Sequence, residues 1–102
     1  MPRPSLRLAA SAVADLEAIA GWYAEQGVAE IGVRFISEML EQIEALQDHP
    51  QMGRIVPEFD QAALRELIHP PFRIVYRCTP RRVQVVRVWR SERLLELPRG
   101  RT

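Results

Sequence analysis

The sequence predicts an α+β domain with the order β-α-α-β-β-β, in which an N-terminal helical hairpin packs on one face of a small, mainly antiparallel sheet. Two observations support this prediction. Apolar residues recur at helical spacing in the first half of the chain, and three short runs with strand-like alternation follow in the second half. The chain of 102 residues has the usual size of one domain, so we expect residues 1–102 to form a single unit.

The first half predicts one short strand and two helices. Residues 6–8 alternate between apolar side chains and Arg and are the expected first strand. A helix is then expected with Ser11 as its N-cap and Gly27 at its end. A second helix is predicted over residues 29–48, where a His-Pro pair stops it, and the short link predicts an antiparallel hairpin. The apolar stripes of the two helices are Val13, Leu16, Ile19, Ala20 and Tyr23, then Phe35, Ile36, Met39, Leu40, Ile43 and Leu46.

The second half begins with a loop over residues 50–57, which contains two prolines and a glycine. Three predicted strands follow at residues 63–69, 72–79 and 82–89, separated by Pro-containing links. Such short links are typical of an antiparallel meander. Residues 91–97 can form a short C-terminal helix.

Charge is distributed unevenly along the chain. Residues 1–53 carry three Arg against eight acidic residues, a net charge of −5, whereas residues 54–102 carry eleven Arg against five, a net charge of +6. This asymmetry suggests an anionic partner for the second half. The alternative is that the two halves neutralise each other within one fold. Because all fourteen basic residues are Arg, chemistry that depends on Lys is excluded.

Composition also excludes several classes of protein. The single cysteine, Cys78, cannot form an internal disulfide and is consistent with a reducing cytoplasm. No apolar run approaches the roughly 18–20 residues of a membrane span, and no signal peptide is recognisable. The five glycines are scattered, and neither His49 nor His69 has a ligand partner at helical spacing. We therefore expect a cytoplasmic protein without a cofactor, a metal ion or a membrane partner.

Strand alternation places arginines on one face of the sheet. In the run 72–79, Arg73, Val75 and Arg77 point away from the apolar face. A two-helix hairpin covers only one face, so we expect a partner chain to cover the other; the alternative is scattered apolar residues on a solvent-exposed face. Alternation in the last run predicts two opposed sets, Val83, Val85, Arg87 and Trp89 against Gln84, Val86, Val88 and Arg90.

The candidate partner-binding residues are the arginines of the C-terminal half together with one tryptophan. A guanidinium group binds phosphate or carboxylate through two parallel hydrogen bonds, so a cluster of such groups indicates an anionic macromolecule. Three adjacent strands bring several of these groups together. The candidates are Arg65, Arg73, Arg77, Arg87, Trp89, Arg90 and Arg93.

Five segments of the chain form an ordered set, at residues 11–19, 50–58, 64–67, 72–77 and 86–89. Taken in this order, they resemble the RelE/ParE toxin superfamily. The resemblance extends from Leu6 to about Leu95, and the helical hairpin and the Pro–Gly–Arg loop most resemble the ParE branch.

This resemblance implies the toxin of a type II toxin–antitoxin module. The implied partner is an antitoxin whose acidic C-terminal segment folds over the toxin, in a dimer or a heterotetramer. ParE-like members inhibit DNA gyrase, whereas RelE-like members cleave mRNA in the ribosomal A site. A degenerate member could retain antitoxin binding alone.

The residues help to choose between these activities. Arg73 matches the position of an Arg that RelE-type ribonucleases use, but Leu64 and Glu66 stand near the positions of their other basic residues. The tail after Arg90 contains neither Tyr nor His, and Arg90 itself replaces a His of many ParE relatives. RNA cleavage needs a group that accepts a proton, which Arg does poorly. We expect a gyrase-binding toxin; the alternative is a ribosome-dependent endoribonuclease in which Arg73, Arg87 and Arg90 hold phosphate.

Overall fold

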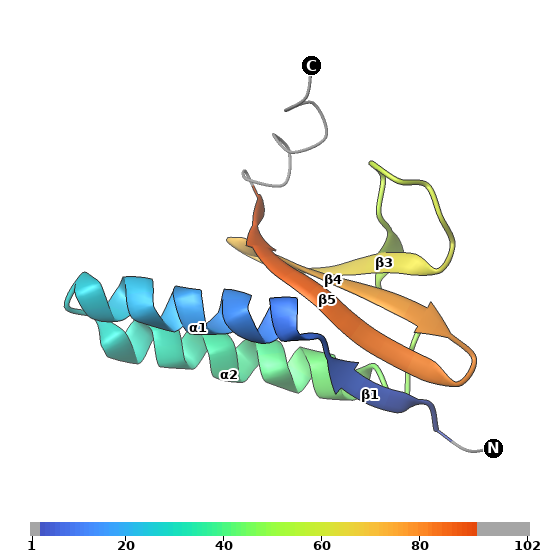
Figure 1. Cartoon of the computed structure of the whole chain (residues 1–102), viewed down its shortest axis with the longest axis horizontal. Helices are drawn as coiled ribbons and strands as arrows, with labels where there is room; N and C mark the ends of the chain where they lie inside the picture. The colour runs from blue at the N-terminus through green and yellow to red at the C-terminus, as the bar shows by residue number, and fades with distance from the viewer. Residues whose placement is uncertain (1–2, 92–102) are drawn as a thin grey trace.

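The structure is a computed structural model that describes residues 3–91 of the chain. Two helices lie side by side against one face of a five-stranded sheet (Figure 1), so the predicted α+β fold with an N-terminal helical hairpin is confirmed. The expected C-terminal helix falls mainly on residues 92–97, outside the described part. The elements are β1 (Ser5–Leu8), α1 (Ala10–Glu25), α2 (Ala29–Ala45), β2 (Arg54–Ile55), β3 (Leu64–His69), β4 (Phe72–Thr79) and β5 (Arg82–Arg90).

The two helices form the expected antiparallel hairpin. Gly27 ends the first one with a φ of +80°, a conformation that glycine adopts without strain. The helices approach closely where Gly32 of α2 meets Tyr23 of α1. The glycine allows this approach, since an added Cβ would lie 2.9 Å from the Cβ of the tyrosine. Neither helix has the length and apolar composition needed to cross a membrane.

The expected cap of the first helix is wrong. The helix begins at Ala10 with Ala9 in the cap position, and no side chain caps it. The hydroxyl of Ser11 donates instead to the carbonyl oxygen of Val86 on β5, at 2.6 Å. This contact ties the start of α1 to the sheet. The second helix ends at Ala45, three residues before the expected end, and turns follow it.

The sheet has the strand order β1-β5-β4-β3-β2. β1 pairs in parallel with the first half of β5, and all the other pairs are antiparallel. The two-residue strand β2 was not expected, because its residues lie in the Pro- and Gly-rich loop. Gly53 allows this pairing, since an added Cβ would lie 2.6 Å from the carbonyl oxygen of Glu66 and 2.7 Å from the hydroxyl of Tyr76.

The main core lies between the helices and the sheet. The predicted alternation of β4 is confirmed, because Phe72, Ile74 and Tyr76 are fully buried on the helix-facing side. Most of the helix residues in this core come from the two predicted stripes. The stripes are wrong at Val13 and Leu40, which are 40% and 37% exposed, and Ala12 is buried beside Val13 instead. The buried members of this core are Ala12, Leu16, Met39, Ile43, Leu46, Leu67, Phe72, Ile74, Tyr76, Val83, Val85 and Val88.

A smaller core lies on the opposite face, and it corrects one expectation. Val56 is fully buried against Leu64 and Val75, and Val86 and Trp89 pack around them. The loop that joins β2 to β3 carries Val56 and rises on the side of the sheet away from the helices (Figure 1). This part of the second face is therefore covered by the chain itself, not by a partner.

A β-bulge in the last strand overturns the predicted alternation there. Tyr76 pairs with Val85 and Val75 pairs with Arg87, so Val86 is an extra residue. A bulge of this kind places two successive residues opposite one and reverses the alternation beyond it. Consequently Val88 joins the helix-facing core, and Val86 and Trp89 pack on the other side. The predicted grouping of Val83, Val85, Arg87 and Trp89 on one face is wrong.

Candidate functional site

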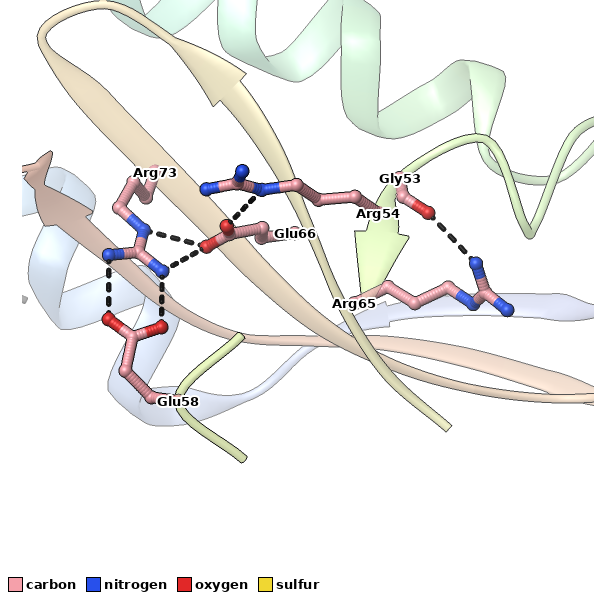
Figure 2. A network of polar contacts seen from close by, with 6 residues as sticks. All are labelled: Gly53, Arg54, Glu58, Arg65, Glu66 and Arg73. Carbon is pink, nitrogen blue, oxygen red and sulfur yellow. Dashed lines mark hydrogen bonds and ion pairs between the residues drawn. The ribbon is translucent and has the colours of Figure 1, made fainter. Parts of the chain in front are cut away.

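Arg73 lies in a buried ion-pair network on the face of the sheet away from the helices (Figure 2). Its Nε donates to Glu66 Oε1 at 2.6 Å, and its two terminal nitrogens donate to the two oxygens of Glu58 at 3.1 and 3.0 Å. Arg54 approaches Glu66 from the other side, with Nε 2.6 Å from Oε2. The side chains of Arg73 and Glu66 are only 4% and 0% exposed. The network thus joins two arginines and two glutamates, with Arg73 and Glu66 buried at its centre and Arg54 exposed at its edge.

The ionisation of this network follows from its contacts. The hydrogen bonds from Arg73 hold the pKa of Glu58 below its ordinary value. Burial alone would lower the pKa of Arg73, but its hydrogen bonds with Glu58 and Glu66 outweigh this effect and the pKa is raised. Arg73 and Glu58 therefore stay charged at neutral pH. A phosphate group could reach Arg73 only by displacing carboxylates that already satisfy it.

Arg87 is held by an acidic residue of the first helix. Its Nε and Nη2 donate to the two oxygens of Asp15 at 2.8 and 2.9 Å, and this hydrogen bonding raises the pKa of Arg87. The same carboxylate accepts a hydrogen bond from the backbone N–H of Val88 at 2.8 Å. The guanidinium carbon of Arg87 lies 4.3 Å from the ring centroid of Trp89, in a cation–π contact. Asp15 thus joins α1 to the half of β5 that β1 does not cover.

A cleft of about 650 Å³ opens beside this ion pair, between α1 and the end of β5. We call it the α1–β5 cleft. Its most exposed aromatic residue is Trp22, 52% exposed. Arg90 lines the other wall, with its guanidinium carbon 5.8 Å from the ring centroid of Phe72. The lining residues are Asp15, Ala18, Ile19, Trp22, Tyr23, Phe72, Arg87, Val88, Trp89 and Arg90.

Arg65 and Tyr76 hold the loop that follows α2. Arg65 lies on the helix-facing side of β3, and its guanidinium group donates to the carbonyl oxygens of Gly53 and Ala62, at 3.0 and 3.1 Å. Figure 2 shows it pointing away from the Arg73 network. The hydroxyl of Tyr76 donates to the carbonyl of Pro50 at 2.8 Å and accepts from the N–H of Gly53 at 3.0 Å. Burial raises the pKa of Tyr76, so its phenol group stays neutral.

The seven predicted site residues therefore do not form one cluster. Arg73 is buried in its network, Arg65 binds backbone carbonyls, and Arg77 is exposed near the end of β4. Three of them, Arg87, Trp89 and Arg90, do come together in the α1–β5 cleft. Arg93 lies outside the described residues. Within residues 3–91, no group of three or more His, Cys, Asp or Glu side chains could hold a metal ion.

Comparison with models of known families shows to which family the chain belongs. The family model described as "ParE toxin of type II toxin-antitoxin system, parDE" matches residues 6–95. The chain belongs to this family. The ParE-type assignment agrees with the predicted order of segments, and the superfamily prediction is confirmed.

A solved structure supports the assignment of this ParE-family chain. It is a chain of the "Chromosomal ParDE TA system from P. aeruginosa", with a TM-score of 0.72 and 27% sequence identity. The alignment covers 86% of this chain and 96% of the other. The search of curated proteins found no match.

Several residues of the candidate site were not predicted from the sequence. Trp22 faces the α1–β5 cleft instead of the core. Its position outside the apolar stripe of its helix was the one feature of the sequence that indicated this. Neither Asp15 nor Glu58 was among the predicted site residues, although both lie in segments that carry the family resemblance, 11–19 and 50–58. Their partners, Arg87 and Arg73, lie 72 and 15 residues away in the sequence. No local pattern connects such distant charges.

Proposed function

We propose that this chain is a toxin that inhibits DNA gyrase by binding it, and that a cognate antitoxin neutralises it. Membership of the ParE family supports the toxin role. The observation that carries the choice of a binding mode over RNA cleavage is the state of Arg73. The one arginine that matches a ribonuclease position is buried and saturated by Glu58 and Glu66.

The chemical requirements of RNA cleavage also favour a binding mode over a ribonuclease. Attack by a 2′-hydroxyl needs a proton acceptor and an unpaired positive charge beside the phosphate. Arg73 and Arg87 already bind carboxylates, and Glu58 would repel an incoming phosphate. Tyr76 faces the helices and its pKa is raised, so it is a poor base. These residues are therefore better suited to stabilising a protein-binding surface than to catalysing RNA cleavage.

A supercoiling assay tests this proposal. Relaxed plasmid, gyrase and ATP are incubated with the purified chain, and the topoisomers are separated on a gel. We expect dose-dependent loss of supercoiling, which addition of the antitoxin reverses. Translating ribosomes incubated with the chain should keep their mRNA intact. Codon-specific cleavage in the ribosomal A site would overturn the proposal and restore the endoribonuclease alternative. Absence of both activities, with no growth defect on expression, would favour a degenerate toxin.

The α1–β5 cleft is the surface that best suits the antitoxin. Its walls combine apolar side chains such as Ile19 and Trp22 with the guanidinium group of Arg90. An amphipathic segment that carries carboxylates matches both features, since aromatic pockets supply most of the binding energy and charges at the rim set specificity. A target such as gyrase also implies that the complex acts in the cytoplasm.

Two matched pairs of variants test this docking surface. Trp22→Ala should weaken antitoxin binding at least about 30-fold, because loss of an anchoring aromatic costs about 2 kcal/mol or more. Val33→Ala is the control, since Val33 is 60% exposed on α2 and does not line the cleft. Arg90→Glu should weaken binding and reduce its salt dependence, whereas Arg77→Glu should not. A larger effect of Arg77→Glu would place the antitoxin on the open face of the sheet.

A further inference from the structure

Four exposed arginines gather at the hairpin end of the sheet, and we call them the hairpin-end patch. They are Arg7 of β1, Arg77 of β4, Arg82 of β5, and Arg81 in the turn between the last two strands. In the sheet, Gln84 pairs with Arg7 on one side and with Arg77 on the other. Side chains that are paired across strands share a face, so Arg7 and Arg77 both point away from the helices. Figure 1 shows this hairpin beside β1, at the opposite end of the molecule from the α1–α2 link.

Within the described residues, the patch has no carboxylate as a counter-charge. Arg73 and Arg87 bind carboxylates of this chain, but across residues 3–91 none of the four patch guanidinium groups makes an ion pair. Neighbouring strands lie about 4.8 Å apart, which puts the backbones at Arg7 and Arg77 about 10 Å from each other. This is slightly more than the Debye length of about 8 Å at physiological salt, so screening weakens the overlap of their fields without removing it, and lower salt strengthens it. The patch therefore favours an anion that carries several charges over a single small ion.

The chemistry around the patch narrows the choice of anion. The turn borders a cleft of about 450 Å³ lined by Arg77, Thr79, Pro80, Arg81, Arg82 and Gln84. The amide of Gln84 adds hydrogen-bond donors, the hydroxyl of Thr79 donates to the carbonyl oxygen of Arg82, and Pro80 is the single apolar member. An acidic peptide usually needs apolar anchors, and a single-stranded nucleic acid needs aromatic side chains on which bases stack. This lining offers neither of these features, whereas arginine and neutral donors are what phosphate oxygens of a duplex require.

We propose that the hairpin-end patch binds the phosphate backbone of duplex DNA. DNA is favoured over an RNA duplex because of the width of the major groove. The turn between β4 and β5 suits the major groove of B-form DNA, which is about 12 Å wide, whereas the major groove of an A-form RNA helix is deep and narrow. The patch shares no lining residue with the α1–β5 cleft. DNA binding by the toxin is thus independent of the gyrase and antitoxin proposals, and their failure would leave it standing.

A salt titration of DNA binding tests the proposal. A short fluorescently labelled duplex without a designed sequence is titrated with the purified chain, and anisotropy is recorded at several salt concentrations. Four phosphate contacts predict that log K falls against log[salt] with a slope of about −3.6. The triple variant Arg77→Gln, Arg81→Gln and Arg82→Gln should reduce the magnitude of that slope by about 3 and weaken binding at least about tenfold at low salt. Circular dichroism checks that the variant keeps its fold.

Single variants supply the matched control. Arg81→Gln and Arg34→Gln each remove one exposed charge, but Arg34 lies on α2, away from the patch. Only Arg81→Gln should reduce the magnitude of the slope of log K against log[salt]. Absence of binding at low salt, or equal slopes for these two variants, would overturn the proposal. Tighter binding of a single strand, an RNA duplex or polyglutamate at the same salt would also overturn it, because each would assign the patch to a different partner.

Discussion

Replacing Arg73 by alanine should destabilise the fold far more than removing an exposed arginine from the same strand. The substitution leaves Glu66 with a fully buried side chain and Glu58 without its two-pronged partner. Breaking a buried ion pair by removing one member costs about 3–5 kcal/mol. Arg54 still contacts Glu66, but its side chain is 59% exposed, so it compensates only in part. For a domain of this size, such a loss lowers the melting temperature by about 12 °C or more.

Urea unfolding followed by circular dichroism measures the effect. Arg77→Ala is the control, since Arg77 lies four residues further along β4 on the same face and is exposed. Its loss should change the free energy of unfolding by less than about 0.5 kcal/mol. Arg73→Lys should fall between the two, because lysine keeps the charge but cannot bind both glutamates in the same plane. If Arg73→Ala were as stable as Arg77→Ala, the network would not hold the sheet and loop together. A stable Arg73→Ala variant that had lost RNA cleavage would instead identify a catalytic arginine.

Three further predictions concern other contacts. The pKa of Glu58 is lower in the folded protein than its ordinary value of 4.5. The ion pair with Arg73 therefore contributes its full stabilisation at pH values above 4.5, and this stabilisation is lost as the pH falls through the pKa of the folded state. Glu58→Gln should therefore make acid unfolding less steep in a pH series; unchanged steepness would place the acid sensitivity elsewhere. Tyr76→Phe should cost about 1–3 kcal/mol in urea unfolding, because the N–H of Gly53 loses its buried acceptor. Asp15→Asn should cost about 1–2 kcal/mol in the same assay, and an unchanged free energy would show that the contact with β5 is dispensable.

Periodic segments were the part of the fold that the sequence could predict. The helical hairpin and the alternation of β4 follow from apolar residues at fixed spacing, and burial of one face makes such spacing informative. The bulge at Val86 was not predictable in this way, because an extra residue in one strand is decided by its pairing with Tyr76 and Val75 on the neighbouring strand. The same reason explains why the two-residue strand β2 was missed.

The candidate site was predicted less well than the fold. Composition identified the arginines, but whether a guanidinium group is available depends on which carboxylate reaches it in three dimensions. Arg73 meets Glu58, from a loop, and Arg87 meets Asp15, from the first helix. Neither pairing has a local signature in the sequence. Trp22 was missed as well. Beside Tyr23 at the end of the first helix, it is expected from the sequence to pack in the core or within the hairpin, whereas the structure leaves it 52% exposed.

The uneven charge of the chain can now be given a structural explanation. Internal ion pairs neutralise part of this charge, and an external anionic partner is what we propose for the rest. Asp15 from the acidic half neutralises Arg87, but the two carboxylates on Arg73 come from the basic half itself. The positive charge left without a carboxylate within residues 3–91 then concentrates at the hairpin end, around Arg81 and Arg82. An arginine satisfied by its own chain should act on stability, and an unsatisfied one on binding. Arg73→Lys and Arg81→Gln separate these effects, since the first should change unfolding and the second only the salt dependence of DNA binding.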